Sequence, residues 1–286
     1  MLERVVPVVG TGAYRRRCGC DTNDLVLTDA QRQAAADALA TAAADRAPID
    51  PLTTTYPDID VVDAYEIQLT NIRRRLAAGA AIRGHKVGLS AKAMQQMLGV
   101  DEPDYGHLLD DMFVFEGFDL PIADYCQPRV EVEVGFVLAE PLSGPSCSVA
   151  DVLRATAYVA PCLELIDSRV KDWKIKLCDT VADNASSAGI VIGGKATPVN
   201  NIDLRTIGAV LRRNGEIIDT GAAGAVLGNP ATAVAWLANK VHAFGVTLEP
   251  GHVILPGSCT KMHPVNAGDS FRADFDQLGS VSINFL

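Results

Sequence analysis

The residues best suited to chemistry in this sequence are Glu131 and Glu133, which alternate with valines in PRVEVEVGFVL at residues 128–138. Alternation predicts a strand with both carboxylates on one face and the valines on the other, core-facing side. In an extended strand the carboxylates lie ~6.5 Å apart and, at an effective dielectric of about 20, repel by about 2 to 3 kcal/mol. The pattern alone leaves open an edge strand with solvated acids and a site for a hard ion such as Mg²⁺ or Mn²⁺.

A third carboxylate, Glu164, stands inside the apolar stretch APCLELI at residues 160–166, which predicts a central strand. A charge buried among Cys, Leu and Ile costs several kcal/mol unless it has a partner. One candidate partner is Arg169, in a structural ion pair. The other is a metal ion held by Glu164 together with Glu131 and Glu133, which would leave coordination positions open for substrate or water.

Two further stretches contain groups that could act beside such a metal. Lys86 lies between Gly84 and Gly88 in a strand-like segment, where small neighbours let a ligand approach. Taken alone, Lys86 is most simply an exposed lysine. Residues 257–260, Gly-Ser-Cys-Thr, offer backbone N–H groups and hydroxyls suited to a carboxylate. The five histidines never have the spacing of a helical metal site, so the metal hypothesis rests on carboxylates alone.

The elements that must position these groups fall into two regions. Thr28 and Gln31 predict a capping box at the start of a helix to about residue 45, and the apolar periodicity of residues 61–78 predicts a second helix. From residue 81 the patterns favour strands and turns, including a hairpin at Asn214-Gly215. We expect an α+β protein with a flexible leader (1–25), a small N-terminal helical region (26–80) and a metal-binding, catalytic, β-rich domain (81–286) on which the helices pack.

The composition argues against several functions. A formal net charge of -10 opposes broad affinity for nucleic acid or anionic lipid. Apolar runs fall short of the ~18 residues that a membrane span needs, and the run at residues 5–9 is too short for an export signal. We therefore expect a cytoplasmic protein that binds neither nucleic acid nor membranes.

Several motifs follow one another along residues 28–286: GHKVGLSAKAMQQMLGVDEPDYGHL, PRVEVEVGFVL, PCLELIDSRV, DNASSAG, TGAAGAVLGNPATAVAWLANK, LPGSCT and AGD. Together they closely resemble the 2-keto-4-pentenoate hydratases, which belong with the 4-oxalocrotonate decarboxylases in the fumarylacetoacetate hydrolase superfamily. Only the leader lies outside the resemblance. It implies a mixed, rolled β-sheet core of the fumarylacetoacetate hydrolase C-terminal type, and a homo-oligomer, often a decamer.

The resemblance also implies roles for individual residues, with Mg²⁺ or Mn²⁺ as cofactor. The metal ligands would be Glu131, Glu133 and Glu164. The catalytic pair would be Lys86, in G-H-K-V-G, and Asp104, in P-D-Y-G. The residues that match the substrate-side pocket are Ser186, Ser258 and Thr260.

The implied activity is hydration of a 2-hydroxyalka-2,4-dienoate, such as the penta- or hexadienoate, to a 4-hydroxy-2-oxoalkanoate. This step belongs to meta-cleavage catabolism of aromatic or steroid rings, upstream of an aldolase. Three alternatives stay open at this point. The first is 4-oxalocrotonate decarboxylation, and the second is hydrolysis of a carbon–carbon bond in an acylpyruvate, for which His85 is the candidate base. The third is a non-catalytic subunit that completes an oligomer.

Overall fold

The computed structural model describes residues 26–286 apart from 92–94, 97–99 and 101. The expected flexible leader, residues 1–25, therefore lies outside the described residues. None of the described helices is long and apolar enough to cross a membrane.

The N-terminal helices begin where the sequence predicts. In α2 (Asp29–Asp45) the Thr28 hydroxyl caps the backbone of Gln31, whose side chain caps Thr28 in return. Asp60 caps α4 (Val61–Ala77), and the short α3 (Leu52–Thr55) lies between the two. The Gln68 side-chain amide on α4 donates to the Val181 carbonyl at 2.7 Å and the Tyr105 carbonyl at 3.1 Å. These bonds fix the helices against the β-rich part of the chain.

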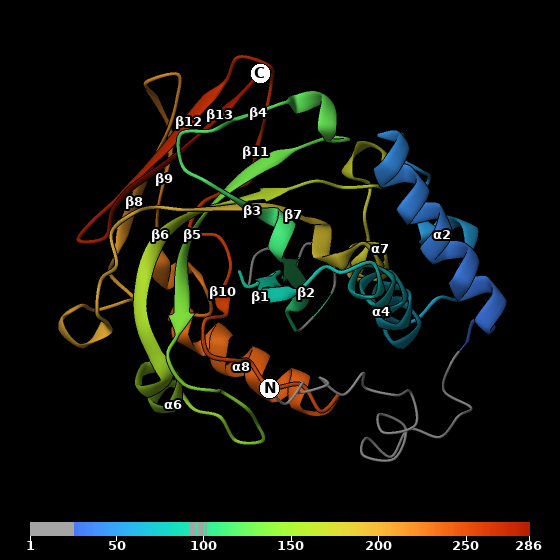
Figure 1. Ribbon diagram of the computed structural model, residues 1–286, viewed down its shortest axis with the longest axis horizontal. Helices are drawn as coiled ribbons and strands as arrows, with labels where there is room; N and C mark the ends of the chain where they lie inside the picture. Colours follow the sequence, from blue (N-terminus) through green and yellow to red (C-terminus); the bar gives the residue numbers. More distant parts are fainter. Residues whose placement is uncertain (1–25, 92–94, 97–99, 101) are drawn as a thin grey trace.

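One large mixed sheet forms the centre of the molecule (Figure 1). Its order is β2-β1-β10-β5-β6-β7-β3, with β11 paired to β5. The β1/β10 and β3/β7 pairs are parallel and the others antiparallel. The strands are β1 (Ile82–Gly88), β2 (Asp104–Leu109), β3 (Phe113–Val114), β5 (Arg129–Leu138), β6 (Thr156–Ile166), β7 (Ser187–Ile192), β10 (Val253–Leu255) and β11 (His263–Pro264).

This sheet is rolled, because the edge strand β2 meets β7, which lies next to the opposite edge strand β3. Leu108 of β2 and Ile190 of β7 belong to one buried cluster with Cys162, Val253 and Leu255. All five share the inner face of the sheet, as the strand registers and alternation require. The expected mixed, rolled sheet in an α+β fold is confirmed.

The outer face supports the main core. Val130, Val132 and Val134 of β5 are at most 1 % exposed there, as alternation predicts. The second sheet has the order β4-β13-β12-β8-β9 and the Asn214-Gly215 hairpin between β8 and β9. Its strands are β4 (Asp119–Leu120), β8 (Gly208–Arg213), β9 (Glu216–Ala222), β12 (Ser270–Phe275) and β13 (Gly279–Phe285).

The remaining elements are short, apart from α8 (Pro230–His242), which Asn229 caps. The other α-helices whose bounds lie within the described residues are α6 (Val149–Ala155) and α7 (Leu177–Ala182). The 3-10 helices are η1 (Asp110–Met112), η2 (Ile122–Asp124), η3 (Lys171–Trp173), η4 (Asn184–Ser186), η5 (Val199–Asn201) and η6 (Ala223–Ala225).

Candidate metal and catalytic site

Three carboxylates converge on the inner face of the rolled sheet. Glu131 pairs with Glu164 across β5 and β6, and Glu133 follows two residues along β5. Each of the three offers an oxygen, and these oxygens all lie within 4.8 Å of one another. Glu133 and Glu164 are fully buried and Glu131 is partly buried. The alternative of an edge strand with solvated acids is wrong, because β5 lies between β10 and β6.

Most of the buried oxygens of this cluster lack a hydrogen-bond partner within the described part of the chain. Glu133 Oε1 and both oxygens of Glu164 accept no hydrogen bond, whereas Glu133 Oε2 accepts one from the Gly257 N–H at 2.8 Å. Burial raises the pKa of all three carboxyl groups. For Glu164 burial outweighs the opposing effect of Lys86 and the pKa reaches about 7. Converging hard oxygen donors with unused lone pairs fit a divalent cation such as Mg²⁺ or Mn²⁺.

Among the described residues, Lys86 forms the ion pair with Glu164. It is 3 % exposed, with its Nζ 3.5 Å from Glu164 Oε1 and donating to the Ala185 carbonyl at 2.9 Å. Burial lowers the pKa of Lys86, but Glu164 and the other carboxylates raise it more, so it ends above its ordinary value. The ammonium therefore stays charged. The interpretation of Lys86 as an exposed lysine is therefore wrong. The predicted ion pair between Glu164 and Arg169 is also wrong, because Arg169 binds Asp183 instead.

Asp104 lies beside Lys86 because a glycine leaves room for it. It stands opposite Gly88 in the β1/β2 pair, and a Cβ on Gly88 would meet Asp104 Oδ1 at 2.1 Å. Asp104 is buried, its Oδ2 accepts from Thr180 Oγ1 at 3.4 Å, and its Oδ1 has no partner among the described residues. Burial raises its pKa, and Lys86 opposes that shift. A carboxyl group of this kind can accept and release a proton.

Ser186 belongs to a strained turn that reaches over the site. Asn184, Ala185 and Ser186 have φ values of 53°, 50° and 55°, a left-handed run that non-glycine residues rarely adopt. The Asn184 side chain holds the turn by bonding both the N–H and the carbonyl of His107. Ser186 Oγ is buried without a hydrogen-bond partner in the described structure. This hydroxyl is free to bind a ligand beside Lys86.

The Ser258 and Thr260 hydroxyls mainly contact backbone. Ser258 Oγ accepts from the Val132 N–H at 3.1 Å and donates to the Val132 carbonyl at 3.3 Å. Thr260 Oγ1 donates to the Lys261 carbonyl at 3.1 Å. The loop of residues 257–260 thus orients Glu133 through the Gly257 N–H. The sequence predicts only that this loop could bind a carboxylate, and not which one.

His85 points away from this site. It neighbours Lys86 on β1, so alternation places it on the outer face, where its ring centroid lies 5.1 Å from that of His107 and 5.7 Å from that of His252. The carbon–carbon hydrolase alternative therefore loses the base on which it depended.

Comparison with known proteins identifies the family of this chain. The family model "Fumarylacetoacetate (FAA) hydrolase C-terminal" matches residues 76–285. The chain is 46% identical over 247 residues to a 2-oxo-hept-4-ene-1,7-dioate hydratase of Escherichia coli, covering 84% of this chain and 92% of the relative. It is 43% identical over 259 residues to a 2-keto-4-pentenoate hydratase of Paraburkholderia xenovorans (strain LB400), covering 91% and 96%.

A solved structure extends the likeness to three dimensions. The 4-oxalocrotonate decarboxylase from Pseudomonas putida G7, complexed with magnesium and adipate, superposes with a TM-score of 0.88 at 38% identity. The match covers 92% of this chain and 100% of that one. The chain therefore belongs to the fumarylacetoacetate hydrolase family, among the 2-keto-4-pentenoate hydratases and 4-oxalocrotonate decarboxylases.

Proposed function

We propose that this protein is a hydro-lyase that converts a 2-hydroxyalka-2,4-dienoate, such as the penta- or hexadienoate, into a 4-hydroxy-2-oxoalkanoate in meta-cleavage catabolism. The observation that carries this proposal is the buried cluster of Glu131, Glu133 and Glu164 with Lys86 and Asp104 beside it. Relatives named as hydratases of such dienoates, at 43% to 47% identity, support it.

Glu131, Glu133 and Glu164 would hold the divalent cofactor, Mg²⁺ or Mn²⁺. When bound, the ion supplies a Lewis acid that stabilises enolate charge on the substrate. The unused buried oxygens of Glu133 and Glu164 are what make these residues suitable ligands.

Lys86 and Asp104 are the groups that we propose to transfer protons. Ketonisation moves the proton of the 2-hydroxyl to solvent and adds one at C5, which gives a 3-en-2-one; water then adds its oxygen at C4 and a proton at C3. Lys86 stays protonated and can bind the substrate oxygens or supply a proton. Asp104 has a free, buried Oδ1 and is the group suited to take the proton of the attacking water. Ser186 Oγ would position the substrate, while Ser258 and Thr260 shape the pocket through backbone contacts.

Decarboxylation of 4-oxalocrotonate is the second candidate, because the Pseudomonas putida G7 enzyme has the same fold at 38% identity. Metal-stabilised enolate chemistry serves loss of CO₂ as well as hydration. A non-catalytic role has less support, since a scaffold gains nothing from burying three carboxylates and a lysine together.

A turnover assay separates these functions. Five- and six-carbon 2-hydroxydienoates and 4-oxalocrotonate are each followed by ultraviolet absorbance with Mg²⁺ or Mn²⁺, and CO₂ release is measured in parallel. We expect hydration of the dienoates, its loss in excess EDTA and its return with metal. Release of CO₂ faster than hydration would identify a decarboxylase, and full turnover in EDTA would exclude the metal site.

Assembly and location are further parts of the proposal. As the family resemblance implies, the protein would form a homo-oligomer such as a decamer, work in the cytoplasm and pass its product to an aldolase. Light scattering of the purified protein tests the assembly, and a monomer at working concentration would contradict it.

A further inference from the structure

Arg129 is the next residue outward from the metal ligands on the same face of β5. Arg129, Glu131 and Glu133 alternate along the strand, so their side chains leave the inner face in sequence. Two residues of strand separate Arg129 from Glu131 by roughly 6.6 Å along the backbone. The Arg129 side chain is half-buried there.

The inner space is closed at the other end. Leu108 and Val253 lie on the inner face level with Val137, beyond Glu133, and Cys162 and Ile190 lie directly beside Glu133 and Glu164. These residues belong to one buried apolar cluster. A substrate whose head group lies at the carboxylates must therefore extend its chain outward, toward the end of β5 where Arg129 lies.

The guanidinium of Arg129 is held in place, but no acidic side chain in the described part of the chain forms an ion pair with it. It lies 4.5 Å from the ring centroid of Trp173, and the Trp173 indole N–H donates to the Gln127 carbonyl at 3.0 Å. Across the described residues no ion pair or hydrogen bond engages the Arg129 side chain. Asp172 is near, but its carboxylate binds Lys174 at 2.8 Å.

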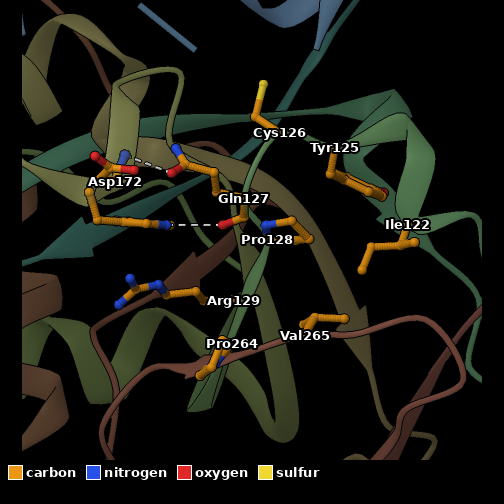
Figure 2. Close-up of a pocket in the computed structure, with 10 residues that line it drawn as sticks. Ile122, Tyr125, Cys126, Gln127, Pro128, Arg129, Asp172, Pro264 and Val265 are labelled. Atoms are coloured by element: carbon orange, nitrogen blue, oxygen red, sulfur yellow. Dashed lines mark hydrogen bonds between the residues drawn. The ribbon is translucent and has the colours of Figure 1, made fainter. Parts of the chain in front are cut away.

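Arg129 and Trp173 also line a cavity of about 330 Å³. Figure 2 shows Arg129, the first residue of β5, and the preceding Pro128 on opposite sides of the chain, with Pro264 and Val265 along the lower wall. The cavity wall does not include the three glutamates; it begins one pleat farther out. A stacked guanidinium without a counter-ion, bordering a cavity of this size, is suited to a carboxylate because its planar fork matches the two oxygens.

We propose that Arg129, stacked on Trp173, binds a second carboxylate at the far end of the substrate, so that the enzyme favours dicarboxylic 2-hydroxydienoates over monocarboxylic ones. This inference rests on the proposed hydratase function and narrows its substrate class. The competing role for Arg129 is to balance the charge of Glu131, which would affect metal binding and all substrates alike.

The test compares 2-hydroxyhepta-2,4-diene-1,7-dioate with 2-hydroxypenta-2,4-dienoate in the full-length, metal-loaded protein. Arg129→Met should lower kcat/KM for the dioate about 10- to 100-fold, mainly through KM, as expected for loss of a hydrogen-bonded charge pair. The value for the pentadienoate should stay within about twofold. Arg129→Lys should recover part of the loss. The matched control is Arg83→Met, which removes an exposed arginine from the opposite face of β1.

Binding measurements keep the outcomes separate. Calorimetry with Mg²⁺ should give wild-type metal affinity for Arg129→Met, and adipate should bind the wild type more tightly than this variant. Equal losses for both dienoates, or a changed metal affinity with unchanged selectivity, would overturn the carboxylate subsite in favour of charge balance. A wild type that hydrates neither dienoate would refute the hydratase function, while unequal adipate binding would still support the subsite.

Discussion

Glu164 shows how a single buried carboxylate combines stability with function. Its burial is unfavourable for the charged form, and Lys86 at 3.5 Å compensates only in part, since the pKa of Glu164 still reaches about 7. Near neutral pH the residue is thus poised between protonated and ionised forms. A cation that binds Glu164 must displace that proton.

Metal affinity should consequently depend on pH. We expect the dissociation constant for Mg²⁺ or Mn²⁺ to increase as the pH falls below 7, by about tenfold per pH unit for each proton displaced. Calorimetry at pH 6 and pH 8, in buffers of different ionisation enthalpy, measures both the affinity and the proton release. Glu164→Gln should bind metal weakly with a flatter pH dependence; wild-type affinity in this variant would remove Glu164 from the ligand set.

Lys86 permits a second test at this scale. Lys86→Met should lower kcat/KM by roughly 10² to 10⁴, as expected for loss of a positioned acid–base or clamping group. In EDTA at pH 8 it should also lower the free energy of unfolding by about 3 kcal/mol, because Glu164 loses its partner. The penalty should shrink at pH 6, where Glu164 is protonated.

Steady-state kinetics at saturating metal and urea unfolding measure the two effects. Lys171→Met, at an exposed lysine that pairs with Asp50, is the matched control and should leave both quantities unchanged. Near wild-type turnover in Lys86→Met would leave Asp104 to carry the proton chemistry.

At the scale of elements, glycines in β1 and β2 allow other parts of the chain to approach the site. A Cβ on Gly106 would meet the Asn184 carbonyl oxygen at 2.4 Å, so this glycine lets the left-handed turn at residues 184–186 approach Lys86. The turn is also anchored by the buried Arg169–Asp183 pair. The precision of the catalytic groups therefore depends on close backbone packing.

Gly106→Ala should displace that turn and cost about 1 to 3 kcal/mol of stability through overpacking. Because the glutamates lie on β5 and β6, metal affinity should stay within about twofold while kcat falls. Gly194→Ala is the control, since its Cβ would meet nothing within 4 Å. Parallel loss of metal binding in Gly106→Ala would indicate general unfolding, and unchanged kcat would show that the turn does not position Lys86.

The histidines on the outer face of β1 and β2 should make the stability of the protein depend on pH in the acid range. Burial, followed by its neighbours His107 and His252, holds the pKa of His85 well below 6.5, and burial lowers that of His107 to about 4. The unfolded chain therefore binds more protons between pH 6.5 and 4, and stability is lost as the pH falls through that range.

Between pH 7 and pH 4.5, the free energy of unfolding of His85→Leu, measured with urea, should fall less than that of the wild type. The reason is that this variant has one fewer buried histidine with a lowered pKa. Its turnover should remain close to the wild-type value, since His85 faces away from Lys86. A large fall in kcat with intact metal binding would restore His85 as a catalytic candidate.

The sequence predicts some of these elements better than others. Alternation alone places Glu131 and Glu133 opposite the valine core, and an acid within APCLELI already requires a partner. Local patterns do not reveal that β10 lies parallel to β1, or that Arg169 pairs with Asp183. They also leave the roles of Ser258 and Arg129 undetermined, because these depend on which distant strands become neighbours.

At the scale of the molecule, the described chain forms a rolled sheet that carries the site, a second sheet, and helices that cover them (Figure 1). The family match over residues 76–285 spans nearly all of the β-rich part. Of the expected organisation, the leader at residues 1–25 and the boundary near residue 80 stay predictions.

Removal of residues 1–24 tests the prediction that the leader is a flexible segment. We expect the truncated protein to keep its unfolding midpoint and oligomeric state, with turnover within about twofold, because this segment lacks apolar periodicity and lies outside the resemblance. Circular dichroism, light scattering and kinetics on both proteins measure this. A smaller assembly after truncation would show that the leader is structural.

The position of β10 between β1 and β5 has a consequence for how the protein folds. The neighbouring strands β5 and β6 can pair early, which brings the three glutamates together. We expect Lys86 and the Gly257 N–H to join them only after β10, near the end of the chain, inserts beside β1. A nascent chain that still lacks its last residues thus exposes an acidic half-site able to capture cations before the catalytic lysine arrives. We expect metal capture to precede recovery of activity in stopped-flow refolding, and simultaneous recovery would argue for a single concerted step.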